Sequence, residues 1–434
     1  MIVTATLLPE GYFWSFDMQT PDMTTINAIP ASRPMFRAWL AVALLCVVGC
    51  LNYLDRIMIT TMRESIVSAI SITDTQFGML TSVFLWVYGL LSPFAGFLAD
   101  RFSRSRVIII SLFVWSAVTW LTAHATTYEQ LLATRALMGI SEACYIPAAL
   151  ALITDYHRGP TRSLATGIHM AGIMFGQSLG FVGGWIAERS DWSHAFSLFG
   201  IVGIVYAFIL FFFLRDAPQR QTAATTERPV NFREGVRNLF STRAYWLALA
   251  FWGLIGVVNW MIVSWLPTYY KEQFNLSQSI AGLYATGYFH TASLLGVLAG
   301  GAWADRWSRS NPRARILVPA IGLAIAAPCI LMASSTDVLV LAITGFVMFA
   351  FTRTFTDANM MPILCLISDS GYRATGYGIL NMVGCIVGGI GIYAGGALRD
   401  ADVNLRLVFQ LAAGVALLCV LVLLLIRPKA AKGA

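Results

Sequence analysis

Charged side chains are scarce in this sequence: of its 434 residues, only 12% are Asp, Glu, Lys or Arg, whereas 57% are hydrophobic. Soluble proteins average about 25% charged residues. A soluble protein of this length would have too little charge to cover its surface, so the composition excludes that class and predicts a membrane protein. Because one crossing of the bilayer needs about 20 apolar residues, the chain has room for about twelve transmembrane helices.

Several motifs of enzyme active sites are also missing. None of the three lysines, Lys271, Lys429 and Lys432, follows a glycine, so the chain lacks the GxxxxGK[ST] loop that binds the phosphates of ATP. The HExxH zinc motif and paired metal-ligand spacings are absent as well. We therefore expect no enzyme, no metal ion and no cofactor.

The seven cysteines include no CxxC pair, and all of them lie inside apolar segments. Cysteines in that setting act as small buried residues, so we expect neither disulfides nor metal ligands. They are Cys46, Cys50, Cys144, Cys329, Cys365, Cys385 and Cys419.

Apolar segments separated by short polar loops predict an all-α membrane protein. The longest interior polar stretch, 215–243, divides the chain into two six-helix bundles, 36–214 and 244–427, and is expected to be a cytoplasmic linker. Residues 1–35 are expected to be a disordered tail, with Met35 as an alternative start, and 428–434 a cytoplasmic tail. The twelve predicted helices cover about 37–66, 76–98, 105–124, 129–154, 162–187, 195–214, 244–270, 279–303, 314–333, 338–367, 374–397 and 405–426.

The basic residues are distributed unevenly between the predicted loops. If both termini are cytoplasmic, the inner loops hold 21 Lys and Arg, the outer loops hold 5, and three more lie within the apolar segments. Loops rich in Lys and Arg stay in the cytoplasm. This asymmetry predicts a multi-pass protein of the inner (plasma) membrane with both termini inside. It also explains the excess of basic residues without a nucleic-acid partner. The expected partners are the lipid bilayer, a small-molecule substrate and protons, and the protein is expected to be a monomer.

One ten-residue segment occurs twice. GFLADRFSRS at 96–105 recurs 205 positions later as GAWADRWSRS at 301–310, after the second predicted helix of each half. Such a repeat implies two homologous bundles. Transporters built in this way bind their substrate near mid-membrane, at the interface between the repeats.

The first copy and its surroundings resemble the major facilitator superfamily, whose signature GxLADRFxRxR matches residues 96–106. Within that superfamily, NYLDR at 52–56 and TRALMGISEA at 134–143 are similar both to the anion:cation symporters of sugar acids and organic anions and to the Spinster-type lipid transporters. RSLA at 162–165 and NPRA at 311–314 are closer to Spinster. The resemblance implies two pseudo-symmetric six-helix bundles that work by alternating access.

Six charged residues lie inside predicted helices, where each costs about 2.5–3.5 kcal/mol on insertion scales and needs a partner or a purpose. At 1.5 Å per residue, Asp55 and Arg135 lie at similar depths, about 27 and 30 Å from the inner face, so we expect them to meet. Glu142 lies two helical turns from Arg135 on the same face, near mid-membrane. The six residues are Asp55, Arg56, Arg135, Glu142, Arg353 and Asp357.

The symporter resemblance implies roles for four of these residues. Glu142 takes the proton, Arg135 and Asp55 form a switching pair, and Arg56 contacts an anionic substrate. Burial favours a neutral carboxyl and nearby arginines favour an ionised one, a competition that allows titration at physiological pH. The alternative is a permanent structural cluster of ion pairs.

Other candidates have structural alternatives. Arg353 and Asp357 are four residues apart on one helix, so they are expected to pair, either as a strut or as cavity lining with Asn359. Tyr53, Asn259 and His290 are predicted substrate contacts, although helix packing is an alternative for each. The repeated loops predict a cytoplasmic gate that latches in one conformation, although capping and topological charge explain the same residues. The gate residues are Gly96, Asp100, Arg101, Arg104, Asp305, Arg306 and Arg309.

Together these observations predict a proton-coupled secondary transporter that moves a small organic anion, either a sugar acid or a carboxylate, by alternating access. The alternative is a Spinster-like transporter of a lysolipid or another amphiphile.

Overall fold

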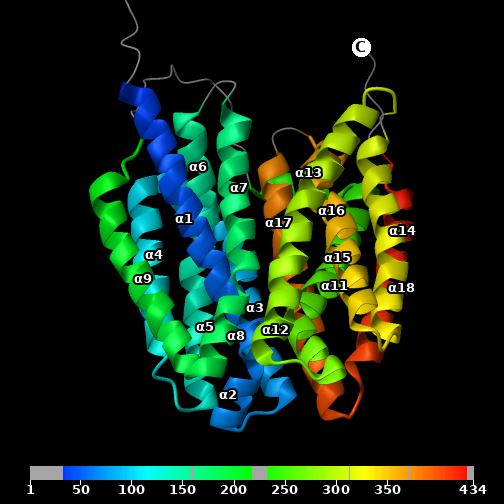
Figure 1. Ribbon diagram of the computed structural model, residues 1–434. Coiled ribbons are helices and arrows are strands. Elements are labelled where there is room, and N and C mark those ends of the chain that lie inside the picture. Colours follow the sequence, from blue (N-terminus) through cyan, green and yellow to red (C-terminus); the bar gives the residue numbers. More distant parts are fainter. Residues whose placement is uncertain (1–32, 158–160, 218–231, 312, 370–371, 428–434) are drawn as a thin grey trace, which may run out of the picture.

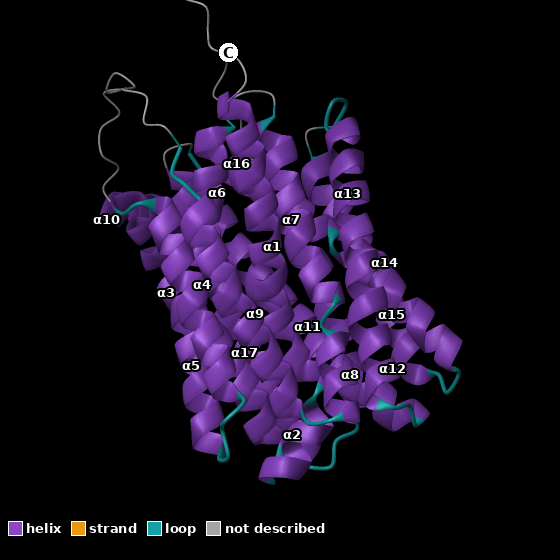
Figure 2. Cartoon of the chain, turned by 60° about the vertical axis from the view of Figure 1, so that its left-hand side comes forward, coloured by secondary structure: helices purple, strands orange, loops and turns teal. Residues whose placement is uncertain are grey.

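The computed structural model describes residues 33–157, 161–217, 232–311, 313–369 and 372–427, and within these ranges every regular element is helical (Figures 1 and 2). The helices stand side by side in two halves that are in contact at one face of the molecule (Figure 1). We call the face where α1 begins and α18 ends the terminal face, and the opposite one the distal face. The first half contains α1(Arg33–Thr61), α2(Arg63–Ile70), α3(Asp74–Arg101), α4(Arg104–Thr122), α5(Tyr128–Ala143), α6(Tyr145–Tyr156), α7(Arg162–Ser178), α8(Phe181–Arg189) and α9(Trp192–Phe213).

The second half repeats this arrangement. Its elements are α10(Phe232–Phe240), α11(Arg243–Phe274), α12(Gln278–Gly282), the π-helix η2(Leu283–Tyr288), α13(Phe289–Trp307), α14(Ala314–Ser335), α15(Leu339–Arg353), α16(Phe355–Ile367), α17(Arg373–Asp400) and α18(Leu405–Leu425). Eleven segments of the described chain are long and apolar enough to cross a membrane. The twelfth expected helix is the continuous run from α12 through η2 to α13, so the predicted all-α membrane fold is confirmed.

Several predicted single helices are interrupted, which corrects their expected boundaries. The first ends at Thr61 and restarts at Arg63, because Met62 leaves the helical conformation. The fourth breaks at Cys144, just before Pro147, whose ring would clash with the carbonyl of Ala143 in a continuous helix.

The tenth predicted helix breaks at Thr354 in the equivalent place. The Thr354 hydroxyl donates to Ser293 O of α13 at 3.1 Å and is also within hydrogen-bond distance of Phe351 O in its own helix, at 2.9 Å. A side chain that bonds nearby carbonyls in this way competes with the helical ladder. The two breaks directly follow the charged residues at the ends of α5 and α15. Each pair of helices therefore changes its backbone geometry beside those charges.

The expected linker contains a helix that the hydropathy pattern did not predict. α10 lies at the terminal face (Figure 2). Its Leu239 is buried and lies near Gly376 of α17, and the Tyr372 ring lies against Gly235. The apolar face of α10 therefore packs on the second half.

Glycines bring α1 and α7 into close contact. A Cβ built on Gly176 would lie 2.1 Å from the carbonyl oxygen of Cys50, and one on Gly172 would lie 2.5 Å from the Cys46 sulfur. Such approach is what small residues provide between membrane helices. Gly172 and Gly176 therefore allow α1 and α7 to pack closely.

Gly176→Ala should destabilise the protein by about 1–3 kcal/mol, because the added methyl group meets backbone that cannot move aside without separating α1 from α7. Thermal unfolding in lipid nanodiscs measures the change. Gly167→Ala is the matched control, since it lies on the same helix and its added Cβ meets nothing within 4 Å. Equal melting temperatures for the two variants would contradict the packing role of Gly176.

Candidate functional site

Four buried charged residues from two helices form the centre of the first half. Asp55 and Arg56 are 2% and 3% exposed on α1, and Arg135 and Glu142 are fully buried on α5. The α1 helix continues without a break through its two charges, and the interruption at Cys144 follows directly after Glu142. We call these four residues the charge cluster.

Arg56 and Glu142 form the ion pair of this cluster, with Arg56 Nη2 donating to Glu142 Oε2 at 2.9 Å. Three aromatic rings enclose the Arg56 guanidinium, with their centres 4.4 Å (Tyr53), 4.8 Å (Phe84) and 4.6 Å (Tyr88) from it. Cation–π contacts strengthen when they are shielded from water, so this cage stabilises the charged arginine inside the membrane. Phe84 and Tyr88 were not predicted; the only signal is their spacing of four residues on α3.

The expected pairing of Asp55 with Arg135 is not formed in this conformation. Asp55 Oδ2 accepts a hydrogen bond from the Thr119 hydroxyl at 3.3 Å, while Arg135 Nη1 donates to the Met138 sulfur at 3.3 Å. The other carboxylate oxygen of Asp55, and Nε and Nη2 of Arg135, have no partner among the described residues. Helical rise gave the depths of the two side chains but not the direction in which each one points.

Buried polar groups without a partner are costly, and several atoms of the charge cluster are of this kind. Arg135 lies within electrostatic range of both Asp55 and Glu142. One oxygen of Glu142 and Nε of Arg56 are also without a partner. The cluster therefore holds two carboxylates and two arginines of which only one pair is joined.

The second half holds the predicted pair between Arg353 and Asp357, which is confirmed. Arg353 Nη2 lies 2.6 Å from Asp357 Oδ2, and the arginine side chain is 10% exposed whereas that of the aspartate is 42% exposed. An acid so exposed within a membrane span requires a water-filled space beside it. Tyr53, which covers Arg56 in the first half, is within electrostatic range of Asp357.

The remaining predicted substrate contacts differ in whether their side chains already have hydrogen-bond partners. His290 is buried on α13 near Arg353, and its Nε2 has no partner among the described residues. Asn359 is buried and donates to Phe355 O of its own helix at 2.9 Å, so its amide nitrogen is already used. Asn259 is half-buried on α11, and its side chain makes no hydrogen bond within the described chain.

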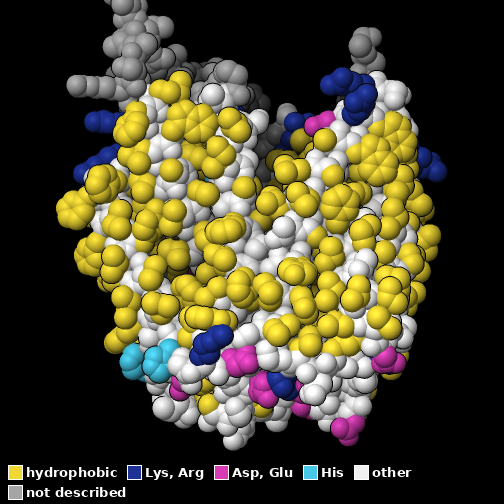
Figure 3. Space-filling model, in the orientation of Figure 1, with side chains coloured by type: hydrophobic (Ala, Val, Ile, Leu, Met, Phe, Trp, Pro, Cys, Tyr) yellow, Lys and Arg dark blue, Asp and Glu magenta, His cyan; other side chains and the backbone are white. Residues whose placement is uncertain are grey.

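The repeated loops lie at the terminal face, where a hollow separates the two halves (Figure 3). In the described part of these loops the ion pairs stay within one half: Arg104 pairs with Asp155, and Asp305 with Arg315 at 3.0 Å. Arg101, Arg306 and Arg309 are exposed. Gly96 and Asp100 belong to α3, and only their backbone is described.

One sequence pattern found in serine hydrolases, a GxSxG segment, does not form an active site in this protein. The GxSxG segment at 176–180 lies at the end of α7, where the Ser178 hydroxyl donates to Met174 O at 3.1 Å, so it is not the strand-to-helix turn that exposes a serine nucleophile. Within the described ranges, no three His, Cys, Asp or Glu side chains are placed to hold a metal ion.

Comparison with known proteins agrees with this architecture. A family model described as the Major Facilitator Superfamily matches residues 45–392 and 270–434. Protein spinster homolog 3 of Danio rerio is 26% identical over 427 residues, which cover 91% of this chain and 80% of that protein. The probable sulfoacetate transporter SauU of Cupriavidus necator is 25% identical over 368 residues, covering 80% of this chain and 85% of that protein.

A solved structure has the same fold. The crystal structure of a bacterial homolog of the human lysosomal transporter Spinster, in an inward-facing and unoccupied conformation, superposes with a TM-score of 0.73 at 22% identity, covering 91% of this chain and 96% of that one. Since the family model spans well over half of its length, the chain belongs to the major facilitator superfamily and is a membrane transporter, not an enzyme.

Proposed function

We propose that the protein is a proton-coupled secondary transporter of an anionic substrate, which lies in the plasma membrane with its terminal face in the cytoplasm. The observation that carries this proposal is the charge cluster, in which Arg56 pairs with Glu142 at 2.9 Å while Asp55 and Arg135 remain unpaired. Permanent packing would be served at lower cost by apolar residues of similar volume.

Proton and substrate are coupled through Arg56. When Glu142 is ionised, it neutralises the arginine, and the site has little affinity for an anion. Protonation of Glu142 leaves Arg56 in its aromatic cage without a counter-ion, so the site gains a positive charge. Each ligand then raises the affinity for the other by the same factor.

Asp55 and Arg135 complete the cycle in this proposal. With no cation within ion-pair distance, the buried Asp55 is expected to be neutral in the present conformation. When Asp55 loses its proton, the nearby Arg135 becomes its partner, and the pair forms only in the states that follow proton release. The loops at 96–106 and 301–309 would exchange their partners within each half for partners across the halves when the cytoplasmic face closes.

For the substrate class, we favour an amphiphile with an anionic headgroup, such as a lysophospholipid, because the sequence resembles the Spinster-type lipid transporters and Spinster proteins are among its relatives. In the arrangement we propose, Arg56 holds the headgroup, and Tyr53, Asp357 and His290 lie around it. The second candidate is a small organic anion, which the sulfoacetate transporter among the relatives favours. Both classes present an anion to the same arginine.

A thermal-shift screen distinguishes the two classes. A lysophospholipid at 100 times its dissociation constant should stabilise the folded protein by about 2.7 kcal/mol. Sugar acids and short carboxylates should leave the melting temperature in nanodiscs unchanged. The shift should disappear in Arg56→Gln and persist in the control Arg189→Gln, whose exposed side chain stacks on Trp185. Stabilisation by the small anions alone would favour the second candidate, and an unchanged response in Arg56→Gln would contradict the proposed site.

A further inference from the structure

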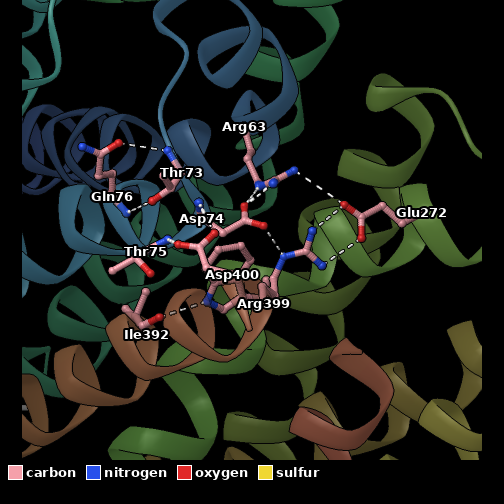
Figure 4. Close-up of polar contacts among 10 residues, drawn as sticks. Arg63, Thr73, Asp74, Thr75, Gln76, Glu272, Ile392, Arg399 and Asp400 are labelled. Atoms are coloured by element: carbon pink, nitrogen blue, oxygen red, sulfur yellow. Dashed lines mark hydrogen bonds and ion pairs between the residues drawn. The ribbon is translucent and has the colours of Figure 1, made fainter. Parts of the chain in front are cut away.

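Asp400, the last residue of α17, caps a helix of the other half at the distal face. Its two carboxylate oxygens accept the backbone N–H groups of Asp74 at 3.0 Å and Thr75 at 2.9 Å (Figure 4). Those groups belong to the first turn of α3, which has no preceding carbonyls to bond. The carboxylate also opposes the positive end of the helix dipole. One half therefore satisfies the first turn of a helix in the other.

Glu188, near the end of α8, makes the same kind of contact in the reverse direction. Its Oε2 accepts the backbone N–H of Ser279 at 2.8 Å, and the Ser279 hydroxyl donates to the same oxygen. Ser279 lies in the first turn of the continuous run from α12 to α13, in the second half. The second half thus receives a cap from the first.

The two caps are related by the internal repeat. Asp74 and Ser279 are 205 positions apart, which is also the spacing of the repeated loops at the other end of the same helices. Their partners Glu188 and Asp400 end the equivalent helices of the two halves, α8 and α17. The arrangement is therefore a reciprocal exchange, in which each half lends a carboxylate to the second transmembrane helix of the other.

A ring of ion pairs adjoins the first cap at Asp74 and also joins the halves (Figure 4). Asp74 bonds Arg63 Nε at 2.8 Å and Arg399 Nε at 2.9 Å, and Glu272 bonds Arg399 Nη2 at 2.7 Å and lies 3.6 Å from Arg63 Nη1. Charges of opposite sign alternate around the ring, and the Asp74 and Arg399 side chains are each only 13% exposed.

Two further residues of the second half, Lys271 and Gln278, contact the first half at this face. Lys271 pairs with Glu64 at 3.0 Å. Gln278, which precedes Ser279, donates to the Ser65 hydroxyl at 3.1 Å and to Gly184 O at 3.3 Å. These contacts connect the region around the first cap to the second one through α2 and α8.

We infer that the two reciprocal caps and the ring act together as the gate that closes the distal face, and that both caps must release for the central site to open there. This gate is distinct from the loops at the terminal face, and it does not depend on the substrate or the coupling ion. As the halves separate at the distal face, Asp74, Thr75 and Ser279 lose their acceptors in one step. The competing explanation is that each cap stabilises only the helix that it contacts, independently of the other cap.

Hydrogen–deuterium exchange of the full chain in nanodiscs distinguishes a gate from local caps. Asp400→Asn should speed exchange about tenfold at the amides of Asp74 and Thr75, and also at the amide of Ser279, at the opposite cap. Glu188→Gln should produce the reciprocal pattern. The control is Asp191→Asn, because Asp191 accepts the N–H of Ser193 and caps α9 within its own half at the same face. Only the first turn of α9 should respond in that variant.

Increases confined to the cap that carries the substitution would overturn the inference. The wild-type protein provides a second measurement that does not depend on a variant that folds. Raising the salt concentration from 0.1 M to 1 M shortens the screening length to about 3 Å. Exchange should then rise at both caps in parallel, whereas a rise at one cap alone, or at neither, would contradict a shared gate.

Discussion

Glu142→Gln is expected to abolish accumulation of substrate driven by an imposed pH gradient, while exchange of labelled for unlabelled substrate across the membrane continues. Glutamine has the shape and neutrality of protonated glutamate, so Arg56 loses its counter-ion permanently and the site binds the anion without a proton. Transport then persists in both directions, but the gradient no longer supplies a driving force. Accumulation by the variant should fall to the equilibrium level, whereas the wild type should concentrate the substrate.

Proteoliposome uptake with and without an acid exterior measures this difference, and counterflow into preloaded vesicles measures exchange. Glu129→Gln is the matched control, because Glu129 belongs to the same helix, α5, but is exposed. It should behave like the wild type in both assays. If Glu142→Gln accumulated substrate as well as the control does, Glu142 would not be the proton carrier.

The sequence predicts the scaffold well because the bilayer imposes strong constraints on it. Apolar length gives the number of crossings, and the repeat gives the two halves. Contacts within one helix can also be predicted from the sequence, since a spacing of four residues places Arg353 beside Asp357. In each case the information lies within one segment of the chain or in the comparison of two.

Contacts between helices are harder to predict from the sequence. Arg56 and Glu142 are 86 residues apart, and the depth of a residue along its helix does not fix the rotation of that helix about its axis. This is why residue depth predicts a pair between Asp55 and Arg135 that the structure does not form. The aromatic cage depends on the same rotation of α3.

The two caps at the distal face cannot be predicted from the sequence for a similar reason. Glu188 and Asp400 look like ordinary acids at helix ends, and only the placement of the two halves gives each a helix to cap. Their equivalence becomes visible once the 205-residue spacing is applied to the amides that they accept, Asp74 and Ser279. Both caps therefore belong to the arrangement of the halves and not to either half alone.

Arg56→Leu should destabilise the folded protein by about 3–5 kcal/mol, because it leaves the fully buried Glu142 without its ion-pair partner. The double variant with Arg56→Leu and Glu142→Leu should recover most of that loss, since two apolar side chains fill the same space without charges. Thermal unfolding of the wild type, both single variants and the double variant in nanodiscs gives the four melting temperatures of the cycle.

A transport assay of the double variant then shows whether the Arg56–Glu142 pair is needed for transport or only for stability. If the pair couples substrate to protons, the restored protein should fold as well as the wild type and still show no uptake, because it has neither the anion-binding arginine nor the titrating carboxyl. If the pair is a permanent strut, uptake should return together with stability. Apolar residues can replace the packing of a buried ion pair but not its change of charge, so the outcome of this one comparison distinguishes the two roles.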